Sequence, residues 1–382
     1  GTVKVCINVL TRGGAGNESK DNGEWGFAMG SSEKAETVMY SMRGMNSWSG
    51  NPNQTINYIS CHDGYTLTDK IWYKTHDEMG DRTDISFDWY KAAANRLTNT
   101  VILLSQGIPL MYSGDEILRQ KTKEDGWPAH NSGHEKHDDG SDFTNAELDK
   151  LNAFDWSNPA STPYADVTLE YYKGLIEFRK NHAALRCNDY TNGTPDSKLY
   201  TTSYRISDQC IMIYVDGTPN NECSDGILMI LNSGTNTQWV NYYDYGIPQG
   251  NWQACIHGDQ AGVEALWSTT GGVVGVDAMS ATVLVLGDLV DENSVYNRQT
   301  ATGCRHTTHD ENGICSNCGA SVSHSYVSGT CKICGKIQPG SDTTYTVYVN
   351  LTGSSWSKVN VYTWDADSNP ITGSWPGSPM TK

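Results

Sequence analysis

The sequence predicts a multidomain chain, in which an α/β part precedes parts made of β-strands and cysteine-rich turns. Three observations predict this fold class. Short apolar runs alternate with amphipathic stretches over residues 51–187, which is the α/β pattern. Short strands separated by turn signals then fill residues 190–297, and two CxxCG motifs follow within residues 304–335. The length of 382 residues leaves room for such an organisation.

Two predicted strands of the α/β part are each followed by a pair of ionisable residues. His62 and Asp63 come after a predicted strand over residues 56–60, and Asp115 and Glu116 come after one over residues 110–113. In (β/α) barrels the active-site residues lie at the C-terminal ends of the strands. Polar turns are the alternative, but two such pairs in succession favour an active-site rim.

Amphipathic helices are predicted between and after these strands. Residues 85–105 carry apolar side chains at helical spacing, and Gly107 and Pro109 end that pattern. A further helix is predicted over residues 167–181, with Asp166 as its N-cap. The apolar face of the first helix consists of Ile85, Trp89, Ala92, Ala93, Leu97, Val101 and Leu104.

Charge and composition limit the partners. The formal net charge of −17 disfavours nucleic acid and anionic membrane surfaces, and no run of eighteen apolar residues predicts a membrane span. The 21 tyrosines and 12 tryptophans far outnumber the 5 phenylalanines. Such amphipathic rings suit the apolar faces of sugars, although a β-rich protein with exposed aromatics would have the same composition.

Three segments of the α/β part resemble a known family when they are taken together. INYISCHDGYTLTDKI and SQGIPLMYSGDEILRQK resemble the seventh- and eighth-strand segments of the α-amylase superfamily, glycoside hydrolase family 13. LNAFDW and YYKGLIEFRKNHAALR resemble its barrel-closing segment, and the set is most similar to bacterial type I pullulanases. The resemblance implies that residues 1–187 form the C-terminal portion of a catalytic (β/α)8 TIM barrel. Residues 188–298 would be the all-β sandwich that follows it.

The resemblance also implies roles for the ionisable pairs. Asp63 would stabilise the oxocarbenium-like transition state, and His62 would bind sugar hydroxyls. Asp115 and Glu116 would contact the substrate, which is starch, pullulan or a related α-glucan. The nucleophile and the general acid/base of this retaining family lie on earlier strands, so we expect the fragment alone to be inactive. Gly64 stands where pullulanases usually have Asn.

The expected function is that of a fragment of an α-1,6-glucan debranching hydrolase. The alternatives are an α-1,4-acting amylase of the same superfamily and a non-catalytic starch-binding or scaffold protein. The resemblance further implies an extracellular or cell-surface location in a bacterium.

A long polar loop follows Arg119 and is expected to line the substrate groove. Its acids and histidines could hold a cation, or they could simply face solvent. Calcium is possible here, but no specific motif supports it. The residues concerned are His130, His134, His137, Asp138 and Asp139.

The cysteine-rich segment over residues 299–337 predicts a structural zinc site. Cys315 and Cys318 form one CxxC motif, Cys331 and Cys334 form another, and a glycine follows each. Four thiolates at this spacing are typical of a closed, zinc-ribbon-like site. Two disulfides are the alternative, and further candidate ligands are Cys304, His306, His309 and His324. Thiol or disulfide stays open for the scattered cysteines, Cys6, Cys61, Cys187, Cys210, Cys223 and Cys255.

A polar linker over residues 338–344 leads into a β-patterned stretch over residues 345–382. VYTWD and SWPGSPMT in this stretch resemble a family-26 carbohydrate-binding module of the starch-binding type, cut at Lys382. The resemblance implies that Tyr362, Trp364 and Trp375 form its aromatic platform. A place in the core of the module is the alternative for any of the three rings.

Overall fold

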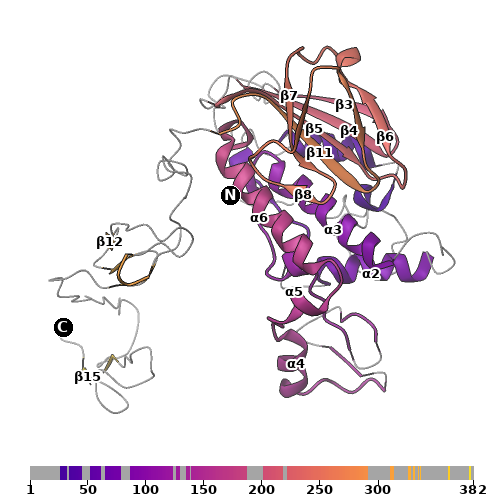
Figure 1. The fold of residues 1–382 in the computed structure, drawn as a ribbon. Helices are drawn as coiled ribbons and strands as arrows, with labels where there is room; N and C mark the ends of the chain where they lie inside the picture. Colours follow the sequence, from indigo (N-terminus) through magenta and orange to yellow (C-terminus); the bar gives the residue numbers. More distant parts are fainter. Residues whose placement is uncertain are drawn as a thin grey trace. The chain divides into compact units, whose positions relative to one another are not determined.

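A computed structural model describes two compact units, Gly1–Gly303 and Cys304–Lys382, which are treated separately (Figure 1). In the first unit it describes residues 26–31, 34–44, 52–61, 65–78, 87–123, 126–129, 135–137, 139–186, 201–217 and 222–290. In the second unit it describes residues 310–313, 326–327, 330–331, 334, 336, 360–361 and 378–379. The predicted boundary between residues 187 and 188 therefore falls inside one compact unit.

Two short parallel strands begin the α/β part. β1 (Ile56–Asn57) pairs with β2 (Ile108–Pro109), and the amide of Leu110 continues the pairing by donating to the carbonyl of Asn57 at 2.9 Å. The prediction of a strand over residues 110–113 is wrong, because the paired strand lies two residues earlier. Gly107 fixes this position: its φ is +101°, and a β-carbon there would lie 2.6 Å from the Thr55 hydroxyl.

Three helices dominate this part of the unit: α2 (Leu67–Glu78), α3 (Phe87–Leu104) and α6 (Ala165–Asn181). Two of them were predicted within two residues at each end. α3 is buried on nearly every side, including its polar positions, rather than along one apolar face. Asp166 is not the N-cap of α6, because Tyr164 holds that position with φ 65° and no side chain caps the helix.

Arg179 on α6 fixes the turn that links α3 to β2. Its guanidinium donates three hydrogen bonds of 2.7 Å, to the carbonyls of Leu103, Ser105 and Gly107. The Leu103 carbonyl lies in the last turn of α3, where an α-helix leaves its carbonyls unsatisfied, and the carbonyls of Ser105 and Gly107 lie beyond the end of the helix. Burial lowers the pKa of Arg179 to about 10, so the side chain stays charged at neutral pH. A residue of α6 thereby positions the strand that precedes Asp115.

The β-part is a seven-stranded sheet facing a small second sheet. The strand order is β3-β4-β5-β11-β7-β8, with β9 also paired to β7, and β6 pairs with β10 in the second sheet. All pairings are antiparallel. The bounds are β3 (Thr201–Ser207), β4 (Cys210–Asp216), β5 (Ser224–Asn232), β6 (Gln238–Asn241), β7 (Trp252–His257), β8 (Gln260–Ala261), β9 (Trp267–Thr269), β10 (Val273–Val276) and β11 (Ser280–Gly287).

Both faces of the large sheet are covered. One face shares a core with the small sheet around Trp252, Met212 and Val276. The other face packs against helices, including α1 (Ala35–Met42), in a core that joins Val38 to Ile213 (Figure 1). Burial on both faces explains why the central strands read as continuous apolar runs without alternation.

Shorter elements complete the described chain. They are η1 (Phe27–Met29), η3 (Pro52–Gln54), η4 (Asp115–Ile117), α4 (Asn145–Asn152), α5 (Asn158–Ser161), η5 (Ala183–Arg186) and η8 (Tyr242–Tyr245). In the second unit β12 (Tyr326–Val327) pairs with β13 (Thr330–Cys331), and β14 (Asn360–Val361) pairs with β15 (Ser378–Pro379). Across the described residues, no helix is long and apolar enough to cross a membrane.

Candidate active site at the ends of two parallel strands

The two ionisable pairs predicted from the sequence follow neighbouring parallel strands. His62 and Asp63 lie outside the described residues, whereas Ser60 before them and Asp115 after β2 are both described. The Ser60 hydroxyl donates a 2.6 Å hydrogen bond to Oδ2 of Asp115. The segments that carry the two pairs are therefore joined directly, and the active-site rim itself stays a prediction.

Asp115 lies in the protein interior, with 1% of its surface exposed. Burial raises the pKa of Asp115 to about 7, although the hydrogen bond from Ser60 and the charge of Lys70 act in the opposite direction. The backbone of Asp115 is held as well, because Asn95 donates to its carbonyl at 3.1 Å. Direct contact of Asp115 with a sugar stays a prediction, and the geometry is that of a buried link between two segments.

A second buried carboxyl supports the same region and was not singled out from the sequence. Asp69 on α2 accepts a 2.9 Å hydrogen bond from the amide of Lys121. Burial raises the pKa of Asp69 to about 6, against the effect of its hydrogen bonds. On the same helix, Lys70 donates to the carbonyl of Ile59 at 2.8 Å. The start of α2 thus holds the end of the first strand segment and the segment after Arg119.

Glu116 is half-buried, and its carboxylate accepts the amide of Gly114 at 2.8 Å. The next charged residue, Arg119, also turns back toward Gly114, because its amide donates to that carbonyl at 2.9 Å. The substrate contact of Glu116 stays a prediction.

The long loop after Arg119 is described only in part. His130, His134 and Asp138 lie outside the described residues. Asp139 folds back on its own turn, where Oδ1 accepts the amide of Ser141 at 2.9 Å. Nε2 of His137 lies 3.4 Å from a carboxylate oxygen of Glu147. No group suited to a metal ion includes a described residue of this loop.

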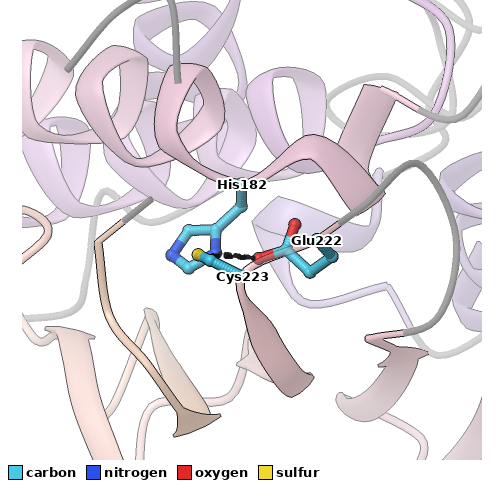
Figure 2. A group of neighbouring side chains, drawn as sticks. All are labelled: His182, Glu222 and Cys223. Carbon is cyan, nitrogen blue, oxygen red and sulfur yellow. Dashed lines mark hydrogen bonds and ion pairs between the residues drawn. The ribbon is translucent and has the colours of Figure 1, made fainter. Parts of the chain in front are cut away.

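His182, Glu222 and Cys223 form a cluster of potential metal ligands, of which His182 is buried and the other two residues are partly buried (Figure 2). Nδ1 of His182 lies 2.7 Å from Oε1 of Glu222, and the other oxygen of Glu222 accepts the Ala184 amide at 2.7 Å. The Ser224 hydroxyl also donates to Oε1 at 2.9 Å. Because the carboxylate is already saturated with protein donors, the arrangement is that of a junction between the end of α6 and the start of β5.

The electrostatics of this cluster favour an ionised Glu222. Burial acts to raise the pKa of Glu222, but the hydrogen bond and charge of His182, together with donors from Ala184 and Ser224, outweigh burial and lower the pKa to about 2. The side chains of His182 and Glu222 are both fully buried. The pair is therefore a buried hydrogen-bonded contact, and the loss of one partner would leave the other without its bond.

Half of the predicted zinc site lies within the described residues. Cys331 is buried at the end of the β12–β13 hairpin, and its amide donates to the carbonyl of Lys336 at 2.8 Å. Cys334 is in a turn and lies in the sequence between these two bonded residues. Such a turn fits the donor set of a structural zinc ion.

Several other predicted residues lie outside the described part. These are Cys315, Cys318, Tyr362, Trp364 and Trp375. Of the scattered cysteines, Cys210 and Cys255 carry buried thiols rather than disulfides. Burial raises the pKa of each to about 12, so they act as small apolar residues in the core.

Comparison with curated proteins identifies the relatives of this chain. Pullulanase from Bacillus subtilis is 31% identical over 167 residues, which are 42% of this chain and 19% of that protein. Chloroplastic pullulanase 1 from Arabidopsis thaliana is 48% identical over 71 residues, which are 19% of this chain and 7% of that protein. The homologues of this chain are pullulanases and isoamylases. No family model matches the chain.

Solved structures agree with this relationship. The pullulanase from Bacillus acidopullulyticus superposes with a TM-score of 0.56 and 26% identity, covering 73% of this chain and 29% of that one. The coarse prediction of a pullulanase-like fold with helices and β-sheet domains is thereby confirmed. The chain spans 19% and 7% of the two curated pullulanases it matches, so it corresponds to a limited part of these homologues.

Proposed function

We propose that this pullulanase homologue is part of a debranching glycoside hydrolase that cleaves α-1,6 links in starch or pullulan. In this proposal residues 1–187 supply the last strands of the catalytic barrel, and residues 188–298 supply the β-sandwich behind it. The observation that carries the proposal is the parallel pairing of β1 and β2, together with the Ser60–Asp115 hydrogen bond that joins the segments running from these strands to the two ionisable pairs. Similarity to pullulanases and isoamylases supports the bond preference.

The proposed chemistry assigns Asp63 to stabilisation of the transition state. A carboxylate that grips ring hydroxyls binds more tightly as positive charge develops on the sugar, so it lowers the barrier. His62 would donate to hydroxyls of the same sugar, and Glu116 would contact the next glucose residue of the substrate. Asp115 acts as a positioning residue, because its bond to Ser60 holds the segment that leads to His62. The nucleophile and the general acid/base are assigned to no residue of this sequence.

The second unit would serve attachment. Cys315, Cys318, Cys331 and Cys334 would bind one structural zinc ion, which supplies the folding free energy that so short a segment lacks. Tyr362, Trp364 and Trp375 would stack on successive glucose units and tether the enzyme to starch, which raises the local substrate concentration. An enzyme that works on polymeric starch in this way would act outside a bacterial cell or on its surface.

Product analysis tests the proposal. The protein, extended upstream of Gly1 to the length of the homologous pullulanases, is incubated with pullulan and separately with linear amylose. Release of maltotriose from pullulan is the expected result. Cleavage of amylose alone would contradict the debranching function and favour an α-1,4 amylase. Starch binding without any cleavage would favour the scaffold protein.

A further inference from the structure

A cavity of about 360 Å³ lies between the loop after Arg119 and helix α4. Its size falls within the range of small-molecule sites in proteins. His137 and Phe143 of the loop, Glu147 and Lys150 of α4, and Phe154 after α4 are among the residues that line it. A capping box at Thr144 fixes the start of α4, so Glu147 and Lys150 are held on a defined helix.

The lining combines aromatic rings with charges of both signs. The ring centroids of His137 and Phe143 are 4.3 Å apart, and Glu147 lies beside His137. Lys123 and Lys150 would repel a cation, while Glu147 and Asp155 would repel an anion. A neutral ligand with many hydroxyl groups suits this lining, because its hydroxyls can both donate and accept and its C–H faces can lie on the rings.

An unusually exposed tryptophan stands next to the cavity. Trp156 is 83% exposed, and its ring centroid lies 4.4 Å from that of Phe154, at an interplanar angle of 44°. The two rings together form one apolar surface beside the cavity. Trp156 thereby extends the aromatic wall that Phe154 forms inside the cavity.

The cavity is tied to the candidate active site through Arg119. The guanidinium of Arg119 lies 5.5 Å from the centre of the Phe154 ring and 5.7 Å from that of Tyr112. It also donates to the carbonyl of Asn152 at the end of α4. Since the backbone of Arg119 is bonded to Gly114, the cavity wall is fixed to the segment that carries Asp115.

We propose that this cavity, with Trp156 beside it, binds glucose units of an α-glucan chain next to the cleavage site. The proposal deepens the proposed function and rests on it for the identity of the sugar. One glucose face lies on Trp156 and Phe154, and hydroxyl groups meet Glu147 and Lys150.

Local footprinting tests this proposal on the full 382-residue chain. Lysines are acylated with and without maltotetraose, and the modified positions are located by mass spectrometry. Maltotetraose should slow acylation of Lys150 but not of Lys173, whose side chain is 60% exposed on α6. Trp156→Ala should raise the maltotetraose concentration for half-protection about tenfold, since one aromatic contact is worth roughly 1.4 kcal/mol.

Two variants give matched controls. Trp239→Ala removes an equally solvent-facing tryptophan, 70% exposed on β6, and should leave the protection of Lys150 unchanged. Trp364→Ala, in the predicted starch-binding stretch, should also leave it unchanged. Absence of protection at saturating maltotetraose, or protection that survives Trp156→Ala in a folded protein, would overturn the proposal. If the upstream-extended protein cleaves pullulan while maltotetraose leaves Lys150 unprotected, the proposed sugar site in the cavity is wrong and the debranching function stands.

Discussion

Ser60 and Asp115, fifty-five positions apart in the sequence, meet in a hydrogen bond of 2.6 Å in the protein interior. The contact joins the segment before His62 and Asp63 to the segment after β2. A buried carboxyl is tolerated here because it can accept from Ser60, but burial still makes its ionised form costly. A buried carboxyl outside the proposed catalytic pair therefore holds the segment that leads to it.

Asp115→Asn should change how stability depends on pH. The folded-state pKa of Asp115 is about 7, above the ordinary value of 3.8. A raised pKa favours folding below the ordinary value, and that contribution is lost as pH rises through about 7. The variant should therefore gain stability relative to the wild type over this interval, by on the order of 4 kcal/mol at most.

Urea unfolding at a series of pH values measures this difference. Asp88→Asn, whose side chain is 47% exposed, provides the control and should run parallel to the wild type throughout. A constant gap between Asp115→Asn and the wild type at every pH would contradict the raised pKa.

Glu222→Gln should destabilise the protein with the opposite pH dependence. The pKa of Glu222 is about 2, below the ordinary value of 4.5, so its contribution is present above 4.5 and is lost as pH falls toward 2. Removing one partner of the buried pair with His182 should cost about 3 kcal/mol near neutral pH. Thermal melts at neutral and at acidic pH check this.

Cys223→Ser provides the comparison for this junction, because it alters the neighbouring side chain while keeping the bond between His182 and Glu222. It should cost much less than Glu222→Gln. Equal losses in the two variants would show that packing, rather than the hydrogen bond between His182 and Glu222, holds α6 to β5.

Elements that depend on a local residue pattern could be predicted from the sequence. Elements whose position depends on contacts with distant residues were predicted less well. The spacing of Trp89, Leu97 and Val101 predicted α3 to within two residues. The second strand was misplaced because a two-residue strand has no period of its own, and its position depends on Thr55 and Asn57 across the pair. The capping box that begins α4 was a readable signal that went unused.

The supporting residues of the candidate site were harder to foresee. His62 and Asp63 could be proposed from the sequence alone, because they directly follow a predicted strand. Asp69 could not, since its role depends on the Lys121 amide fifty-two positions away. The same holds for Arg179, which meets three carbonyls more than seventy positions earlier in the chain. The spacing of apolar residues along the sequence contains no information about such long-range contacts.

Metal analysis of the second unit should find one zinc ion per chain. Cys331→Ser and Cys334→Ser should each abolish tight zinc binding, because a structural site needs all four ligands. Elemental analysis of protein purified without added metal, with titration of accessible thiols after chelation, gives the result. If the protein holds no metal and the cysteines of residues 299–337 are oxidised, the segment is held by disulfides and the zinc prediction is wrong.

Binding to granular starch should depend on the predicted aromatic platform. Trp364→Ala should weaken adsorption by about tenfold, since it removes one stacked ring. Sedimentation of the chain with starch granules measures this, and Trp239→Ala on β6 is the matched control. Unchanged adsorption in a folded Trp364→Ala protein would place this tryptophan in the core of its module.

The most direct test of the central claim compares two carboxylate variants of the upstream-extended protein acting on pullulan. Asp63→Asn should lower kcat roughly a thousandfold while maltotriose binding persists, because the lost interaction is worth several kcal/mol in the transition state. Asp208→Asn, in the exposed turn between β3 and β4, should leave kcat unchanged. Full activity in Asp63→Asn would contradict the assignment of Asp63 and, with it, the account of this site.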